Sequence, residues 1–318
     1  MATTQRKPPG NPPPRGTRYT GKPPTRKQRR NQAAVRSISV SRRPPWQSPT
    51  VVTSVSVGIV AIVLIIIVVI NQAAGGNATT STPISAAVAS AIEHPSASVI
   101  QTVGSGRQAG QMVRLPGNTV LKDASGKPMV VYVGAEYCPF CAAERWSMVY
   151  WLSQFGTFKN LTEIKSSSTD VYPNTSTVTF YKSSYTSSSI DFSFAETEDV
   201  NRNTLQTPTK LAAGLFLKYD TPPYTTQAQG FPFIDIGGLY ALYATSYSPS
   251  LLANLTWDQI AAKLKNPSDP VTQAIVGNAN IMTAATCIAT GDVPASVCSS
   301  STIQAIEPSL KALKTPTK

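Results

Sequence analysis

A single long apolar segment divides the chain and limits what the parts on either side of it can fold into. The twenty residues from Val51 to Ile70 carry no charge and are rich in Val, Ile and Leu. As a helix with a rise of about 1.5 Å per residue, they span the roughly 30 Å hydrocarbon core of a bilayer. A buried helix of a soluble domain is rarely so uniformly apolar, and the long basic leader argues against a cleavable signal peptide. We therefore expect one transmembrane helix at residues 51–70.

The segment before this helix is basic and rich in proline. Residues 1–47 contain twelve Lys or Arg, nine Pro and no Asp or Glu, whereas the rest of the chain holds sixteen residues of each sign. This composition predicts a disordered tail, which the positive-inside rule places in the cytoplasm. Its expected partner is anionic lipid headgroups, and the alternative is a tail that only sets topology. We expect no specific nucleic acid partner, because a charge run alone does little to specify one.

The part of the chain after the membrane helix is then extracytoplasmic, where disulfides persist. It contains all four cysteines, Cys138, Cys141, Cys287 and Cys298. Residues 71–98 are rich in Ser, Thr and Ala and are expected to form a tether with one short helix near residues 84–92, followed by a folded domain at residues 99–318. The only histidine, His94, has no second histidine or cysteine near it in the sequence, so we expect neither a metal nor a cofactor.

Hydrophobic patterns in this region predict an α/β fold. Val130–Val133 is a β-branched run suited to a buried strand, and residues 141–155 are expected to form a helix that Gly156 ends. Further strands are expected at residues 177–181 and 190–194. Two extended runs, 231–236 and 239–243, flank Gly237-Gly238, which is typical of a tight hairpin, and the capping box at 256–259 predicts a helix through residue 264.

The candidate chemistry lies in the motif Cys138-Pro139-Phe140-Cys141, which follows the predicted buried strand and opens the predicted helix. At this spacing both sulfurs meet on the first helical turn, and the free N–H groups and dipole of the helix stabilise a thiolate at Cys138. A redox pair is the leading interpretation. A zinc site is the weaker alternative, because Cys287 and Cys298 are eleven residues apart and lack the short spacing of a second ligand pair.

Two segments resemble the thioredoxin superfamily. The sequence VYVGAEYCPFC at residues 131–141 looks like the active-site strand and turn of that family, and GFPFIDI at residues 230–236 resembles the segment in which a cis-proline begins the neighbouring core strand. The resemblance covers about residues 120–265, with an insertion at about 201–229 and a helical extension at 266–318. The wider arrangement, with the FGTF sequence at 155–158, is also similar to a family of membrane-anchored archaeal and actinobacterial proteins known as a domain of unknown function.

The resemblance implies specific roles for three residues. Cys138 would attack a substrate disulfide, Cys141 would resolve the mixed disulfide, and Pro232 would be the cis-proline beside them. The backbone at Phe231 would then pair with a bound peptide strand. The implied partners are thiols and disulfides of exported polypeptides and an unidentified membrane redox partner, and no cofactor is implied.

The sequence also departs from that family. Many thioredoxins carry a buried carboxylate six residues before the first cysteine, but this position is Tyr132, and a phenol is a poor base at neutral pH. Phe140, between the cysteines, brings no charge or hydrogen bond. We therefore expect the pKa of Cys138 to be lowered mainly by the helix terminus. Glu136 and Glu144 are the nearest acids, either as proton shuttles or as exposed surface charges.

Cys287 and Cys298 flank a turn containing Gly291 and Pro294. A disulfide across this step requires the two Cα atoms to come within roughly 7 Å. A structural disulfide is the simpler interpretation, and a second redox pair that exchanges electrons with Cys138-Cys141 is the alternative.

Taken together, these patterns predict a membrane-anchored, extracytoplasmic thiol-disulfide oxidoreductase that acts on exported proteins. Two alternatives stay open at the level of sequence. The first is a non-catalytic binding module of the same fold, with Cys138 and Cys141 locked in a structural disulfide. The second is a zinc-stabilised adaptor.

Overall fold

The computed structural model describes residues 82–106, 112–226 and 228–317. The predicted basic tail at 1–47, the predicted membrane helix at 51–70 and the first part of the predicted tether lie outside the described residues. Among the helices that the structure describes, none has both the length and the hydropathy that a membrane span requires. The fold is a mixed α/β arrangement, as the sequence predicted.

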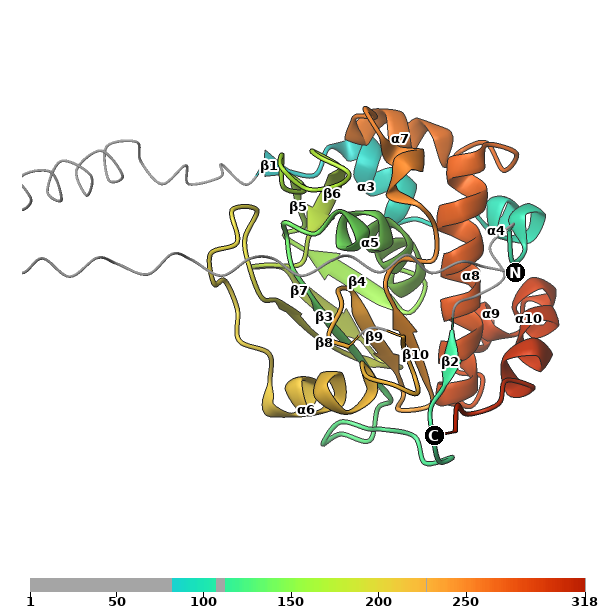
Figure 1. The fold of residues 1–318 in the computed structure, drawn as a ribbon. Helices are drawn as coiled ribbons and strands as arrows, with labels where there is room; N and C mark the ends of the chain where they lie inside the picture. The colour runs from blue at the N-terminus through green and yellow to red at the C-terminus, as the bar shows by residue number, and fades with distance from the viewer. Residues whose placement is uncertain (1–81, 107–111, 227, 318) are drawn as a thin grey trace, which may run out of the picture. The chain divides into compact units, whose positions relative to one another are not determined.

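A five-stranded sheet forms the centre of the fold (Figure 1). Its spatial order is β2 (Val113–Arg114), β10 (Tyr240–Tyr243), β9 (Phe233–Ile236), β3 (Met129–Gly134) and β8 (Asp191–Glu196). Strand β3 runs parallel to β8 and antiparallel to β9, and β9 and β10 form a hairpin. The carboxyl ends of β3 and β8 therefore meet at one edge of the sheet, next to the start of β9.

The hairpin follows from its two glycines. Gly237 and Gly238 have φ values of 65° and 66°, a left-handed conformation that glycine adopts without steric cost. At Gly237 a side chain would also press on the Cβ of Ala289 in helix α8. The sequence-based prediction of two strands joined by this turn agrees with β9 and β10.

Helices cover both faces of the sheet. On one face lie α5 (Pro139–Leu152) and α8 (Pro270–Thr290), packed on alternate strand residues that include Val130, Tyr132, Ile234 and Ile236. On the other face, α6 (Lys210–Tyr219) packs on the intervening residues, among them Val131, Val133, Phe233 and Ala241. Because a strand alternates its side chains, both sets come from the same strands. The segment expected as an insertion at 201–229 thus supplies the helix that covers the second face.

The last part of the predicted tether, residues 82–98, belongs to the folded domain, and the short helix expected within it is present. Residues 82–98 form β1 (Thr82–Pro83), α3 (Ala86–Ile92) and the start of α4 (Ala97–Val103). Val88 and Ile92 of α3 are fully buried, and α3 packs against α5 and against α7 (Trp257–Lys263). The boundary expected at residue 99 is therefore too late, because these two apolar residues are spaced one helical turn apart on a face that the core covers.

Short strands and C-terminal helices complete the described fold. The strands pair as β4 (Gly156–Lys159) with β7 (Ser184–Ser187), and as β5 (Thr162–Lys165) with β6 (Ser176–Thr179) and β1. Helix α8 opens the expected helical extension, yet it packs along α5 as part of the core. It is followed by α9 (Ala295–Cys298) and α10 (Ser301–Lys311), and a short 3-10 helix, η2 (Pro249–Leu252), precedes α7.

Candidate functional site

Cys138 sits at the junction between β3 and α5. It is the N-cap residue of α5, with Pro139 in the first helical turn, where its missing N–H costs nothing. The Cys138 sulfur accepts a hydrogen bond from the backbone N–H of Cys141 at 3.4 Å. The first cysteine therefore takes the place of the usual Ser or Asp cap, so a negative charge on its sulfur faces the positive end of the helix dipole.

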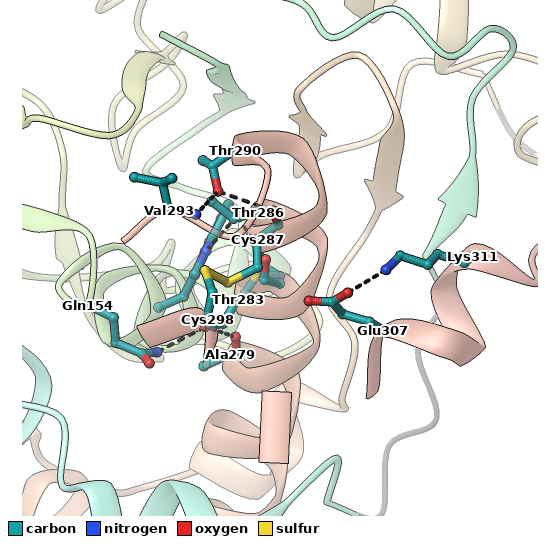
Figure 2. The surroundings of a disulfide bond; sticks show 12 residues. Gln154, Ala279, Thr283, Thr286, Cys287, Thr290, Val293, Cys298, Glu307 and Lys311 are labelled. Carbon is teal, nitrogen blue, oxygen red and sulfur yellow. Dashed lines mark hydrogen bonds and ion pairs between the residues drawn. A yellow bond between two sulfur atoms is a disulfide. The ribbon is translucent and has the colours of Figure 1, made fainter. Parts of the chain in front are cut away.

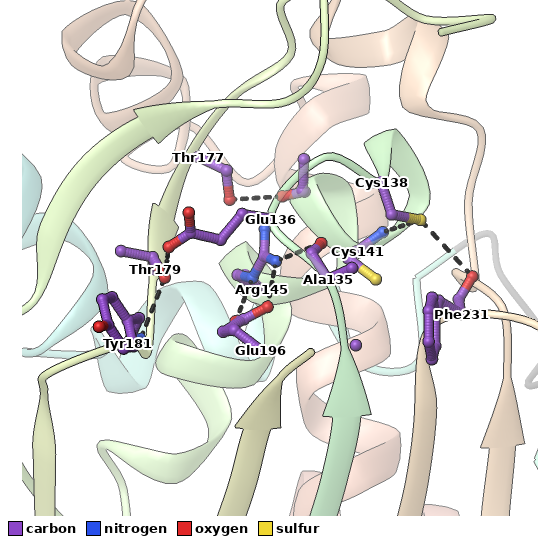
Figure 3. A network of polar contacts seen from close by, with 12 residues as sticks. Ala135, Glu136, Cys138, Cys141, Arg145, Thr177, Thr179, Tyr181, Glu196 and Phe231 are labelled. Carbon is purple, nitrogen blue, oxygen red and sulfur yellow. Dashed lines mark hydrogen bonds and ion pairs between the residues drawn. The ribbon is translucent and has the colours of Figure 1, made fainter. Parts of the chain in front are cut away.

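The same sulfur lies beside the start of β9. Val133 pairs with Phe233 across the β3–β9 ladder, which brings the residues before β9 to the end of β3. The Phe231–Pro232 peptide bond is cis, the conformation that the resemblance implies. The Cys138 thiol lies 3.7 Å from the carbonyl oxygen of Phe231 and donates to it, as Figure 3 shows. The structure thus brings the three expected site residues, Cys138, Cys141 and Pro232, into one place.

The two cysteines differ in exposure but are both free thiols. Cys138 exposes 6% of its surface, whereas Cys141 exposes none. Three aromatic side chains, those of Tyr137, Phe140 and Phe231, pack around the pair. Cys138 is therefore the more accessible of the two sulfurs.

Their pKa values are shifted in opposite directions. The pKa of Cys138 is lowered, first by the hydrogen bond with the Cys141 thiol and then by backbone N–H groups of the helix terminus and by the positive charge of Arg145; burial opposes these effects. Burial raises the pKa of Cys141, and the neighbouring Cys138 raises it further. The expected direction for Cys138 is found, but the helix terminus is not its main cause.

A buried ion pair lies at the same edge of the sheet. Arg145, one helical turn after Cys141, donates from Nε to Oε1 of Glu196 at 2.8 Å and from a terminal nitrogen to Oε2 at 2.6 Å. The same nitrogen also donates to the carbonyl oxygen of Ala135 at 2.7 Å. Both side chains are fully buried. Figure 3 shows this pair beneath the turn that carries the cysteines.

Sequence analysis missed Arg145 and Glu196 as site residues. Two signals were present: Arg145 lies four residues after Cys141, on the same helix face, and Glu196 lies two residues beyond the strand predicted at 190–194. Their proximity depends on the parallel pairing of β3 and β8, which places Glu196 opposite Gly134. Hydropathy alone does not reveal that pairing.

Tyr132, the residue that replaces the expected carboxylate, also reaches this edge. Its ring is fully buried against Phe180, and its hydroxyl lies 3.5 Å from Oε2 of Glu196. Burial raises the pKa of Tyr132 well above its ordinary value, and the positive charge of Arg145 opposes this. The phenol therefore stays protonated and acts as a hydrogen-bond donor.

The interpretation of Glu136 and Glu144 as exposed surface charges is wrong. Glu136 exposes 6% of its surface and accepts a hydrogen bond from the hydroxyl of Thr179 at 2.6 Å. Glu144 is fully buried and accepts from the Asn278 amide at 2.6 Å. Burial raises the pKa of both carboxyls. Glu144 lies in α5 and Glu136 lies just before it, and nearly every residue of this helix is buried by neighbouring segments. Both carboxyl groups are therefore enclosed.

Next to the cysteines lies a pocket of about 400 Å³, formed by Phe140, Tyr172 and residues 244–249. On the opposite flank, the guanidinium of Arg202 lies over the Tyr137 ring at 3.7 Å and forms an ion pair with Asp170 at 2.9 Å. The side chains packed around Cys138 are thus aromatic, with the Arg202–Asp170 ion pair beside Tyr137 and the charge of Arg145 beneath the turn.

The other two cysteines form a disulfide between α8 and α9 (Figure 2). The Cα atoms of Cys287 and Cys298 are 5.5 Å apart, and both residues are fully buried. In the ranges that the structure describes, no group of three or more His, Cys, Asp or Glu side chains is arranged to hold a metal ion.

The fold and the site together define a mixed α/β protein with a buried dithiol at the edge of its sheet. Comparison with protein families places the chain among known sequences. The family described as Domain of unknown function (DUF929) matches residues 121–288, more than half of the chain, so the chain belongs to this family. The matched region contains Cys138, Cys141 and Pro232. No curated protein and no solved structure matches the chain.

Proposed function

We propose that this protein is a thiol-disulfide oxidoreductase with a thioredoxin-like domain. One observation carries the proposal: a free cysteine caps the first turn of α5, with its sulfur 3.7 Å from the carbonyl oxygen before the cis-proline of β9. A sulfur in this place has a lowered pKa and a backbone edge beside it. Both are what attack on a peptide disulfide requires.

The order of elements around the site supports the thioredoxin-like interpretation. A strand carrying the cysteines is followed by a helix, a parallel strand, a helix on the opposite face, an antiparallel hairpin and a final core helix. In this chain those elements are β3, α5, β8, α6, the β9–β10 hairpin and α8. This is the succession of secondary structure in a thioredoxin core, with the short strands β4 to β7 added between α5 and β8.

The mechanism follows from the two unequal thiols. The Cys138 thiolate attacks one sulfur of a substrate disulfide, forming a mixed disulfide, and the released substrate sulfur takes up a proton. Cys141 then loses its proton, attacks the Cys138 sulfur and releases the second substrate thiol. The substrate gains two electrons, and Cys138 and Cys141 become a disulfide. The same steps in reverse oxidise a substrate dithiol.

Substrate backbone is expected to lie along residues 230–232. Gly230 is exposed and Phe231 is half-buried. An extended peptide beside this edge would bring its own disulfide to Cys138 by backbone pairing, a mode that depends little on side-chain identity. Exported polypeptides are therefore the proposed substrates, and a membrane thiol or disulfide partner is proposed to reset the Cys138–Cys141 pair after each cycle.

The proposed location follows from the sequence. A helix at residues 51–70 would anchor the protein, with the basic tail in the cytoplasm beside anionic lipid headgroups and the dithiol domain outside. In that compartment the Cys287–Cys298 disulfide is stable.

Insulin reduction and reoxidation of a reduced ribonuclease test the activity in both directions. We expect the full-length protein to catalyse at least one of them, and Cys138→Ser to abolish the catalysis. A Cys287→Ser/Cys298→Ser variant, which lacks the other cysteine pair, serves as the control and should retain it. Equal rates for the wild type and Cys138→Ser would instead identify a non-catalytic binding module, and stoichiometric zinc in the purified protein would favour the adaptor.

A further inference from the structure

The resolving thiol poses a chemical problem that the attacking thiol does not. Cys141 is fully buried, so water does not take its proton or solvate the thiolate that forms when it attacks the mixed disulfide. An isolated buried anion is unfavourable unless it is hydrogen-bonded or paired. The groups around Cys141 therefore decide how readily the second step occurs.

Three side chains face Cys141 besides its partner Cys138. They are Tyr132 from β3, Arg145 from α5 and Glu196 from β8. The Tyr132 hydroxyl interacts with the Cys141 thiol, which contributes to the raised pKa of the phenol, and it lies 3.5 Å from the Glu196 carboxylate. The second of these contacts is long for an O–H···O hydrogen bond, which is normally 2.5–3.0 Å. The hydroxyl thus lies between two acceptors, the Cys141 sulfur and the Glu196 carboxylate, and is not fixed to either of them.

The strand itself makes room for this hydroxyl. Gly134 lies two residues after Tyr132 on the same face of β3, and a Cβ at Gly134 would collide with the phenol oxygen. A glycine inside a strand commonly marks such a close approach. The phenol ring is fixed at its other end by an edge-to-face contact with Phe180, whose centroid lies 5.4 Å away. The position of the hydroxyl is therefore set by packing.

The ion pair supplies the charge balance. Glu196 neutralises Arg145 through two short hydrogen bonds, and this holds the guanidinium rigidly beneath the cysteine turn. One terminal nitrogen of Arg145, NH1, is buried without a hydrogen-bond partner. A buried cationic donor with open capacity favours the arrival of a negative charge nearby. Such a charge appears when Cys141 ionises.

We propose that Tyr132 is a catalytic hydrogen-bond donor to the Cys141 thiolate in the resolving step, and that Arg145 and Glu196 are positioning residues that keep this donor and a positive charge in place. As Cys141 loses its proton, the Tyr132 hydroxyl turns from Glu196 to the sulfur. The thiolate then attacks the Cys138 sulfur, the bond between Cys138 and the substrate sulfur breaks, and the proton that Cys141 gave up ends on the departing substrate sulfur, so Tyr132 keeps its own proton throughout. This inference rests on the proposed function, because it concerns the second half of that reaction.

Reaction with dithiobis(nitrobenzoate) separates the two half-reactions. Attack by Cys138 releases one coloured nitrothiobenzoate in a phase that depends on reagent concentration, and attack by Cys141 releases a second in a phase that does not. We compare the full-length wild type with Tyr132→Phe, which keeps the ring and its contact with Phe180. The matched control is Tyr150→Phe, which removes a buried hydroxyl nine residues beyond Cys141 on α5.

We expect Tyr132→Phe to slow the second phase about tenfold or more, the effect of losing one hydrogen bond to a charged group, and to leave the first phase within about twofold. Because a less stabilised thiolate forms only at higher pH, the pH profile of the second phase should move upward. Tyr150→Phe should change neither phase. Thermal melts of both variants show whether the fold is kept.

Two results would overturn the inference, and they are distinguishable from each other. A normal first phase followed by an unchanged second phase and pH profile in Tyr132→Phe would show that the hydroxyl plays no part in resolution, while the proposed function would stand. The absence of any first phase in the wild type would mean that Cys138 is not a nucleophile, which would remove the proposed function and this inference with it.

Discussion

At the scale of residues, the buried Arg145–Glu196 pair links the stability of the fold to the site. Both charges are fully removed from water, and each is tolerable only because the other is present. The pair belongs to the site and also holds α5 to the end of β8. A change to either partner should therefore alter stability as well as chemistry.

Replacing Arg145 by Met should destabilise the fold by about 3–5 kcal/mol, because Glu196 is then an unpaired buried charge. The double replacement Arg145→Met/Glu196→Leu should recover most of that loss, since neither charge remains to be desolvated. Urea unfolding of the two variants and the wild type measures both effects. A single variant as stable as the wild type would show that Glu196 is solvated or protonated in the folded state.

At the level of elements, the β9–β10 hairpin carries an unusual buried acid. Asp235 is fully buried in β9, accepts a hydrogen bond from the Gly238 N–H at 2.6 Å, and has its second carboxylate oxygen without a partner. Burial raises its pKa to about 7. The carboxyl is thus neutral in the folded protein at pH values where it is ionised in the unfolded chain.

This shift gives stability a defined pH dependence. A pKa that is raised on folding stabilises the protein fully below the unfolded value near 3.9, and the contribution is lost as pH rises through about 7. The loss is on the order of 4 kcal/mol. Asp235→Asn keeps the acceptor for Gly238 but cannot ionise, so its stability should fall less between pH 4 and pH 8, as measured by urea unfolding. Asp292→Asn, at an exposed residue, should follow the wild type.

The disulfide belongs to the same scale, because it ties α9 to the end of α8. Its loop spans eleven residues, and closing a loop of this size stabilises a fold by roughly 2–3 kcal/mol. Cys287→Ser/Cys298→Ser should therefore lower the melting temperature by several degrees. The first nitrothiobenzoate phase, which reports attack by Cys138, should be unchanged, because the sulfurs of Cys287 and Cys298 are fully buried. A change in the reduction potential of Cys138–Cys141 without loss of stability would instead favour a relay.

Sequence patterns predicted the elements whose signals are local. The Gly237-Gly238 turn, the capping box at Thr256 and Gln259, and the turn that carries Cys138 each depend on a few adjacent residues, and each is present. Strands such as β7, with its Ser-rich sequence, lacked the apolar alternation that reveals a strand. The short helix expected near residues 84–92 is present as α3, but its packing into the core was not predicted, because only Val88 and Ile92 are buried in it. The Arg145–Glu196 contact joins residues 51 apart in the sequence and depends on the pairing of β3 with β8, which no local pattern encodes.

For the molecule as a whole, the main prediction concerns topology across the membrane. In a Cys138→Ser background, a single cysteine can be introduced at Val171, which is 70% exposed, or at Ser37 in the basic tail. In intact cells, a membrane-impermeant maleimide should label Val171→Cys and spare Ser37→Cys, and both should react after the cells are lysed. Labelling of Ser37→Cys in intact cells would reverse the proposed orientation or remove the membrane helix.

The aromatic residues around Cys138 have a consequence for which proteins can react with it. Cys138 has 6% of its surface exposed, and Tyr137, Phe140 and Phe231 pack around it. A disulfide held rigidly inside a folded protein cannot reach a sulfur that is this buried, whereas one in an unfolded, extended segment can. Under the proposed activity, we therefore expect this site to react with extended, unfolded segments in preference to proteins that have completed folding.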